Sequence, residues 1–288
     1  MLDKLSQKES KIIDKLSPKE SKMIDKLSQN DLQLEKPKPG DWLYENKEPG
    51  QSFREYINSS PVTPNQKQCK IYLQPIGVFS KAQQNVIALT ADYLQRFFNL
   101  TTVVADVISD TIIPKSARRT REDGSVQLLA TYILDSVLKN RLPPDAIVCM
   151  AVTEKDLYPA PSWNFVFGLS TFSDRIGVSS IYRYSTKPLD SSNYSICLDR
   201  LTKTSAHEIG HMFYMHHCIH AACIMNGSNN LAESDAGPNR LCSECVSKLY
   251  WNLKFDIRKR LENLNAFFLK HNLKRDYEIS KKDLKLIE

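Results

Sequence analysis

The chain has 288 residues, of which 41% are apolar and 25% are charged. These proportions suit a globular protein with a buried core and exclude collagen-like, wholly disordered and disulfide-dense chains. The net charge is 39 − 33 = +6, and no apolar run approaches the roughly 18 residues that a membrane span needs. The N-terminus lacks the apolar core of a signal peptide. We therefore expect a cytoplasmic or nuclear protein with reduced cysteines and no membrane partner.

The first 35 residues contain a repeat with a period of eleven, because residues 3–11 return at 14–22 with one change, from Gln7 to Pro18, and return in part from Asp25. An apolar stripe with this period is helical but thin, and Ser17 and Glu20 match the start of a helix. So thin a stripe buries little, and residues 1–35 are therefore predicted to be a low-complexity appendage, disordered or folded into short helices. Residues 36–68 hold five prolines and are predicted to form an extended arm.

A compact domain is predicted at residues 69–273, followed by a charged tail at 274–288. The pattern predicts, in chain order, a strand at 71–76, a helix at 82–98, a β-rich segment at 100–108, a helix at 126–137 after an N-cap at Ser125, and a strand at 146–152. This order of elements predicts an α/β fold, a sheet with crossover helices. Further predicted elements are two antiparallel strands at 163–172 and 176–184, a helix that ends near Met215, and helical spacing after Cys245.

The C-terminal segment is basic. Residues 246–288 carry 11 Lys and Arg against 6 acidic side chains. We interpret this surplus as a solvated helix face, because no aromatic-plus-basic recognition motif accompanies it. We therefore expect no nucleic-acid partner. We also expect a monomer.

The histidines are clustered, since five of the six lie between His207 and His220. His207, Glu208 and His211 form an HExxH run. On a helix, positions i and i+4 share one face, so both imidazoles can reach the same metal ion. Glu208 can then lie beside a water molecule on that ion. HExxH alone is weak evidence, because so short a motif also arises by chance.

A third histidine follows the helix. His217 lies ten residues after His207, where a chain that leaves the helix can turn back and supply another ligand. Three nitrogen ligands leave the fourth tetrahedral position for water, which is the arrangement of a catalytic zinc site. His216 is the competing third ligand at this point. His220 is interpreted as an exposed histidine or a partner of a ligand.

Four of the seven cysteines fall within 28 residues, namely Cys218, Cys223, Cys242 and Cys245. A pair of cysteines followed by a C-x-x-C pair has the spacing of a closed four-thiolate zinc site. Four thiolates leave no open position, so such a site would be structural. The alternative is a set of four reduced, buried cysteines. The other three cysteines are interpreted as small core residues: Cys69, Cys149 and Cys197.

Taken together, the histidine and cysteine motifs resemble those of the archaemetzincins, a family of zinc peptidases in the metzincin clan. The motifs that carry the resemblance are His207-Glu208-x-x-His211, His217-Cys218, Cys223-x-Met225 and Cys242-x-x-Cys245, with Asp156-Leu157-Tyr158-Pro159 and Asn164-Phe165-Val166-Phe167-Gly168 upstream. The resemblance covers roughly residues 40–270 and leaves out the N-terminal repeats.

The resemblance implies a metzincin-like α+β variant of the α/β fold. Its features are a mixed, mostly parallel sheet with an antiparallel edge strand, an active-site helix, a four-cysteine zinc subsite and a C-terminal helix. Two zinc ions per chain are implied, one catalytic and one structural. Carried over by position, the catalytic zinc ligands are His207, His211 and His217, the general base is Glu208, the Met-turn residue is Met225, and the structural zinc ligands are Cys218, Cys223, Cys242 and Cys245.

One position departs from the family pattern. Metzincins usually have Gly seven residues after the first histidine, and here that residue is Tyr214. The Gly ends the helix in a left-handed conformation, which costs another residue roughly 1–2 kcal/mol. Either Tyr214 accepts this cost or the chain turns differently.

The sequence therefore predicts a zinc-dependent peptidase that hydrolyses peptide or protein substrates. The edge strand near residues 164–168 either binds an extended peptide by strand addition or is a plain sheet edge. The main alternative is a catalytically inactive, zinc-stabilised protein-interaction module, which Tyr214 favours. A third reading is a four-cysteine module that binds nucleic acid, with the salt-dependent affinity that this requires.

Overall fold

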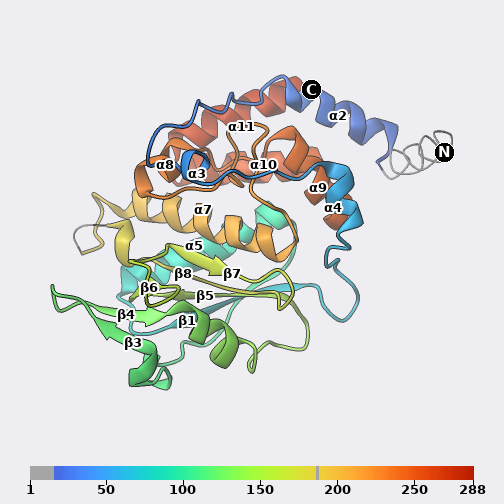
Figure 1. The fold of residues 1–288 in the computed structure, drawn as a ribbon. Coiled ribbons are helices and arrows are strands. Elements are labelled where there is room, and N and C mark those ends of the chain that lie inside the picture. The colour runs from blue at the N-terminus through green and yellow to red at the C-terminus, as the bar shows by residue number, and fades with distance from the viewer. Residues whose placement is uncertain (1–15, 186–187) are drawn as a thin grey trace. The chain divides into compact units, whose positions relative to one another are not determined.

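The computed structural model describes residues 16–185 and 188–288. It contains two compact units. The described part of unit 1 comprises residues 16–61, Met215–Phe268 and Lys274–Glu288, and unit 2 comprises Val62–Tyr214 and Leu269–Leu273. In Figure 1, unit 1 therefore takes its colours from the two ends of the bar, and unit 2, apart from Leu269–Leu273, takes its colours from the middle. No helix within the described residues has the length and apolarity to span a membrane.

Unit 2 is built on a five-stranded sheet in the order β2-β1-β5-β8-β7. Its strands are β1 (Lys70–Ile76), β2 (Thr102–Val104), β5 (Ala146–Thr153), β7 (Gly168–Ser170) and β8 (Ile176–Ser180). The neighbours β2, β1, β5 and β8 pair in parallel, whereas β7 is antiparallel to β8. All eight residues of β5 are buried, as suits a central strand. The predicted mixed sheet with an antiparallel edge strand is confirmed.

Two long helices pack on this sheet and on each other. Helix α5 (Lys81–Phe98) crosses from β1 to β2 and begins with a capping box at Ser80. Helix α7 (Tyr194–Met212) contacts α5, β7 and β8. Phe98 of α5 packs against Phe213 at a ring-centroid distance of 5.5 Å. The end of α7 is thereby fixed beside the edge strand, where the HExxH run lies.

A second, smaller sheet corrects one prediction. It has the order β3-β4-β6, with β3 (Arg118–Thr120), β4 (Val126–Leu129) and β6 (Asp156–Tyr158). The helix expected from residue 126 begins only after β4, as α6 (Ala130–Tyr132) and the π-helical turn η3 (Ile133–Leu138). The reason is tertiary pairing: β4 lies parallel to β6, and Gln127 Nε2 donates to Asp156 Oδ2 at 2.7 Å. Short 3-10 turns complete the unit: η1 (Asp110–Ile112), η2 (Lys115–Ala117) and η4 (Tyr182–Tyr184).

Unit 1 is helical. Its helices are α2 (Pro18–Ser28), α3 (Trp42–Glu45), α4 (Phe53–Asn58), α8 (Leu231–Ala236), α9 (Ser243–Leu253), α10 (Ile257–Lys270) and α11 (Lys274–Leu286), the last residues of α10 falling in unit 2. The helical spacing predicted after Cys245 corresponds to α9 and α10. The two are separated because Lys254 adopts a left-handed φ of 54° and ends α9. The residues predicted as a charged tail form α11.

A buried arginine joins the two ends of the described chain. Arg240 bonds to Asp31, which follows α2, and to Asp283 of α11, with nitrogen–oxygen distances of 2.8 Å for both ion pairs. Asn30 Nδ2 also donates to Asp283 Oδ1 at 2.8 Å. Figure 1 shows α2 and α11 beside each other. A buried charge is tolerated only when it is paired in this way.

The domain boundaries predicted from the sequence stay a prediction.

Candidate metal centres

His207 and His211 lie one turn apart on α7. Their Nε2 atoms are 3.0 Å apart, and their rings meet edge to face at 4.5 Å between centroids. Ligands about 2.0–2.1 Å from a tetrahedral zinc ion are about 3.4 Å apart. The two rings therefore already present the correct atoms at a spacing close to that of a shared metal ion.

Glu208, the residue after His207 on α7, lies against the edge strand. Its side chain is buried, and the hydroxyl of Ser170 on β7 donates to its Oε2 at 2.6 Å. Burial raises the pKa of Glu208 to about 7, and the hydrogen bond from Ser170 opposes the rise. Gly168, on the same strand, leaves room for this carboxylate. A Cβ added there would lie 2.6 Å from Glu208 Oε1.

Tyr214 occupies the left-handed turn that the sequence analysis associates with Gly. Its φ is 66°, and its N–H donates to the His211 carbonyl at 2.8 Å. Its ring packs edge-on against Phe172 at 5.8 Å, and Phe172 also lies 5.6 Å from the ring of His211. Tyr214 thus accepts the strained conformation and ends the helix where Gly would. The aromatic contacts offset part of that cost.

His217, in unit 1, is held by a residue that the sequence analysis did not single out. Its Nδ1 lies 2.8 Å and 3.0 Å from the two carboxylate oxygens of Glu48. The ring of Trp42 meets it edge-on at 5.1 Å. His216, the competing third ligand, is exposed, and so is His220, whose Nε2 lies 3.6 Å from Asp31. Among the three, the environment favours His217 as a ligand.

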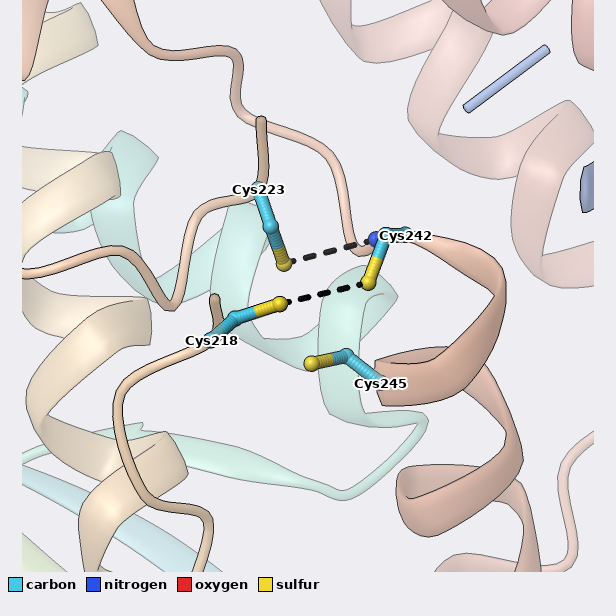
Figure 2. Close-up of side chains that lie close together, drawn as sticks. All are labelled: Cys218, Cys223, Cys242 and Cys245. Atoms are coloured by element: carbon cyan, nitrogen blue, oxygen red, sulfur yellow. Dashed lines mark hydrogen bonds between the residues drawn. The ribbon is translucent and has the colours of Figure 1, made fainter. Parts of the chain in front are cut away.

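The four cysteines of unit 1 come together as predicted. Their sulfur atoms lie within 4.8 Å of one another, and all four side chains are buried. Figure 2 shows the sulfurs pointing toward a common centre, with Cys218 Sγ 3.5 Å from Cys242 Sγ. Zinc bound at about 2.3 Å from each sulfur would space tetrahedral thiolates about 3.8 Å apart. The cluster fits a zinc ion without rearrangement of the chain.

Backbone and side-chain contacts organise this cluster. Cys242 and Cys245 come from the N-terminus of α9, and the N–H of Cys242 donates to Cys223 Sγ at 3.3 Å. The side chain of Asn226 bridges the two ends of the loop from Cys218 to Cys223. Its Nδ2 donates to the Cys218 carbonyl at 2.7 Å, and its Oδ1 accepts from the Cys223 N–H at 2.6 Å. Asn226 is a further residue that motif spacing did not reveal.

The thiols influence one another's ionisation. Hydrogen bonds from the other three thiols, that of Cys223 first, lower the pKa of Cys218 well below its usual value. Burial raises the pKa of Cys223 well above it. One thiolate can therefore form within the group, whereas several buried thiolates need a cation to offset their charge. The donor set suits zinc, which prefers sulfur ligands in closed tetrahedral sites.

Comparisons with known proteins agree with the fold and the motifs. The sequence model described as Peptidase family M54 matches residues 125–250. Archaemetzincin-2 of Homo sapiens is 33% identical over 258 residues, which cover 78% of this chain and 71% of that protein. The archaemetzincin of Archaeoglobus fulgidus is 33% identical over 180 residues, covering 62% of this chain and 98% of that protein. The crystal structure of archaemetzincin from Methanopyrus kandleri matches with a TM-score of 0.53 and 26% identity, over 67% of this chain and all of that one.

A mixed sheet with an antiparallel edge strand, a helix that carries HExxH and a match to a peptidase family define a zinc metallopeptidase. The chain belongs to the archaemetzincins. The family predicted from the motifs is therefore confirmed, and the substrate is a peptide or a protein.

Proposed function

We propose that His207, His211 and His217 hold one catalytic zinc ion and that Glu208 is the general base of peptide hydrolysis. The observation that carries this proposal is the 3.0 Å approach of His207 Nε2 to His211 Nε2, one turn apart on a helix whose Glu208 faces the edge strand. The chain that joins His211 to His217 is short, and its turn at Tyr214 is left-handed. Glu48 is hydrogen-bonded to Nδ1 of His217, which leaves Nε2 of His217 as the proposed ligand atom.

When bound, zinc would act as a Lewis acid that lowers the pKa of water and polarises a peptide carbonyl. The residues of the chain perform the rest of the reaction. Glu208 accepts the proton of the attacking water at a carboxylate oxygen and delivers it to the leaving nitrogen. Ser170 holds Oε2 and so sets the direction of the other oxygen.

The substrate is proposed to lie along β7, the outer strand of the five-stranded sheet. An extended peptide can add to a sheet edge through main-chain hydrogen bonds. Gly168 and Ser170 belong to this strand and adjoin Glu208. A peptide bound there would pass beside the general base.

The second part of the proposal is a structural zinc ion held by Cys218, Cys223, Cys242 and Cys245. The buried sulfurs lie within 4.8 Å of one another, which supports this assignment. Four thiolates leave no position for water, so this ion would stabilise the chain and take no part in hydrolysis.

Metal analysis combined with peptide cleavage tests both parts. We expect two zinc ions per purified chain, hydrolysis of a peptide library, and loss of that hydrolysis when a chelator removes the more accessible ion. The open histidine site should lose its zinc before the closed cysteine site. Two zinc ions without any cleavage would instead identify an inactive interaction module. A single zinc that survives the chelator together with full activity would contradict the histidine site.

Gly168 provides a test of the position of Glu208. In Gly168→Ala, the new Cβ would lie 2.6 Å from Glu208 Oε1, and the carboxylate must move because its surroundings are buried. A displacement of about 1 Å in a catalytic group can lower the rate about 100-fold. We expect a loss of that order in kcat, measured with any cleaved peptide, while the zinc content stays at two per chain.

Gly237→Ala is the matched control, because a Cβ there would lie 3.4 Å from the nearest atom and the residue has an ordinary φ of −77°. Its kcat should match that of the unaltered chain. An unchanged kcat in Gly168→Ala would show that the carboxylate does not act from the position described.

A further inference from the structure

Glu48 lies in the segment between α3 and α4, within the residues predicted to be an extended arm. Its carboxylate contacts Nδ1 of His217 through both oxygens, at 2.8 Å and 3.0 Å. The side chains of Glu48 and His217 are only 23% and 18% exposed. The pair is therefore partly shielded from water, which strengthens it relative to a surface contact.

The surrounding contacts hold this segment against the chain around His217. The N–H of His216 donates to Gln51 Oε1 at 3.2 Å, and Lys248 donates to the Gln51 carbonyl. Gly50 packs so closely on Ile219 that an added Cβ would lie 2.7 Å from its Cγ1. Residues 48–51 thus run along residues 216–219, and Glu48 has little freedom to leave His217.

Trp42 completes the setting of the His217 ring. Its ring meets that of His217 edge-on at 5.1 Å, and its backbone N–H donates to Glu233 Oε1 at 2.8 Å. An added Cβ at Gly227 would collide with the Trp42 ring, so the indole lies tightly against the chain there. The imidazole is therefore restrained by one carboxylate and one aromatic ring.

The chemistry of the pair follows from its donor and acceptor atoms. An ionised carboxylate only accepts hydrogen bonds, so Nδ1 of His217 must donate. That fixes the tautomer in which Nε2 carries the lone pair, and a carboxylate partner makes this nitrogen a stronger ligand. We propose that Glu48 is a positioning residue that orients His217 and raises its affinity for zinc. This inference rests on the proposed role of His217.

The test measures metal affinity rather than turnover. Zinc binding is followed by competition with a chromophoric chelator in three variants: Glu48→Gln, Glu48→Ala and His217→Ala. Loss of such a partner typically lowers metal affinity about 10–100-fold. We expect a loss in that range for Glu48→Ala at the more accessible site, with the second zinc retained. Glu48→Gln keeps an acceptor oxygen without the charge, so its loss should be smaller.

One further readout separates positioning from ordinary stabilisation. With the accessible site filled by cobalt, Glu48→Ala should change the visible absorption spectrum of the ion, which reports ligand geometry. Glu45→Gln is the matched control, because Glu45 is an exposed acidic residue on the neighbouring helix. It should change neither affinity nor spectrum.

The outcomes are distinct. If His217→Ala lowers zinc affinity and both Glu48 variants keep it within twofold of the unaltered chain, Glu48 has no positioning role. If Glu48→Ala lowers only the thermal stability of the chelator-treated protein, the pair is merely structural. If His217→Ala itself leaves the affinity unchanged, the proposed histidine site fails, independently of Glu48.

Discussion

Replacing Glu208 by Ala is expected to lower peptide hydrolysis by about 100- to 10,000-fold, the usual contribution of a general base. The zinc content should stay at two per chain, because the proposed ligands of the accessible ion are the rings of His207, His211 and His217 and do not include Glu208. The variant lacks the carboxylate that accepts the hydrogen bond from Ser170 at 2.6 Å, which is the proposed acceptor of the proton. Steady-state kinetics on a cleaved peptide, with metal analysis of the same sample, measure both quantities.

Glu262→Ala is a suitable control, because Glu262 is an exposed glutamate on α10. It should retain full activity. Undiminished hydrolysis by Glu208→Ala would refute the role given to this carboxylate. A simultaneous loss of zinc would instead assign Glu208 to holding the site together.

Replacing Cys242 by Ser is expected to have the largest effect on stability. The residue supplies one of four buried sulfurs and stands at the N-cap of α9, where its N–H also binds Cys223 Sγ. Loss of a structural metal belongs to the few single changes that cost more than about 4 kcal/mol. We expect the free energy of unfolding in a denaturant titration to fall by about that amount. The zinc content should drop from two to one per chain.

Because Cys218 adjoins His217, the same change should also disturb the third histidine. The cobalt spectrum of the accessible site reports this directly. Cys69→Ser serves as the control, since Cys69 is a half-buried cysteine far along the chain from the four clustered ones. If Cys242→Ser left both the metal content and the cobalt spectrum unchanged, the four thiols would be ordinary buried cysteines.

Much of the site could be predicted because its residues are close in sequence. His207 and His211 share a helix face, and α7 supplies that helix as expected. The four cysteines also meet as their spacing predicts. The family resemblance added the fold, and the parallel strands with an antiparallel edge strand were confirmed. The roles of the individual ligands stay a prediction that the experiments above address.

The supporting residues could not be predicted, because their partners are distant along the chain. Glu48 and His217 are separated by 169 positions, and Ser170 and Glu208 by 38. No local pattern marks a glutamate in a proline-containing segment or a serine in a short strand. The error at residues 126–129 has a related cause. Their apolar spacing fits a helix, but pairing with β6 and the buried bond of Gln127 to Asp156 favour a strand.

The ion pairs of Arg240 have a consequence for biosynthesis. Asp31 and Arg240 are 209 positions apart, so at roughly 5–20 residues per second the ribosome needs about 10–40 s to supply the partner. Helix α2, with 11 residues, is too short to persist alone during that delay. Unit 2, by contrast, is almost continuous and can fold as it emerges. Chaperones that shield nascent segments would therefore be needed most by α2, until Arg240 and α11 have been synthesised.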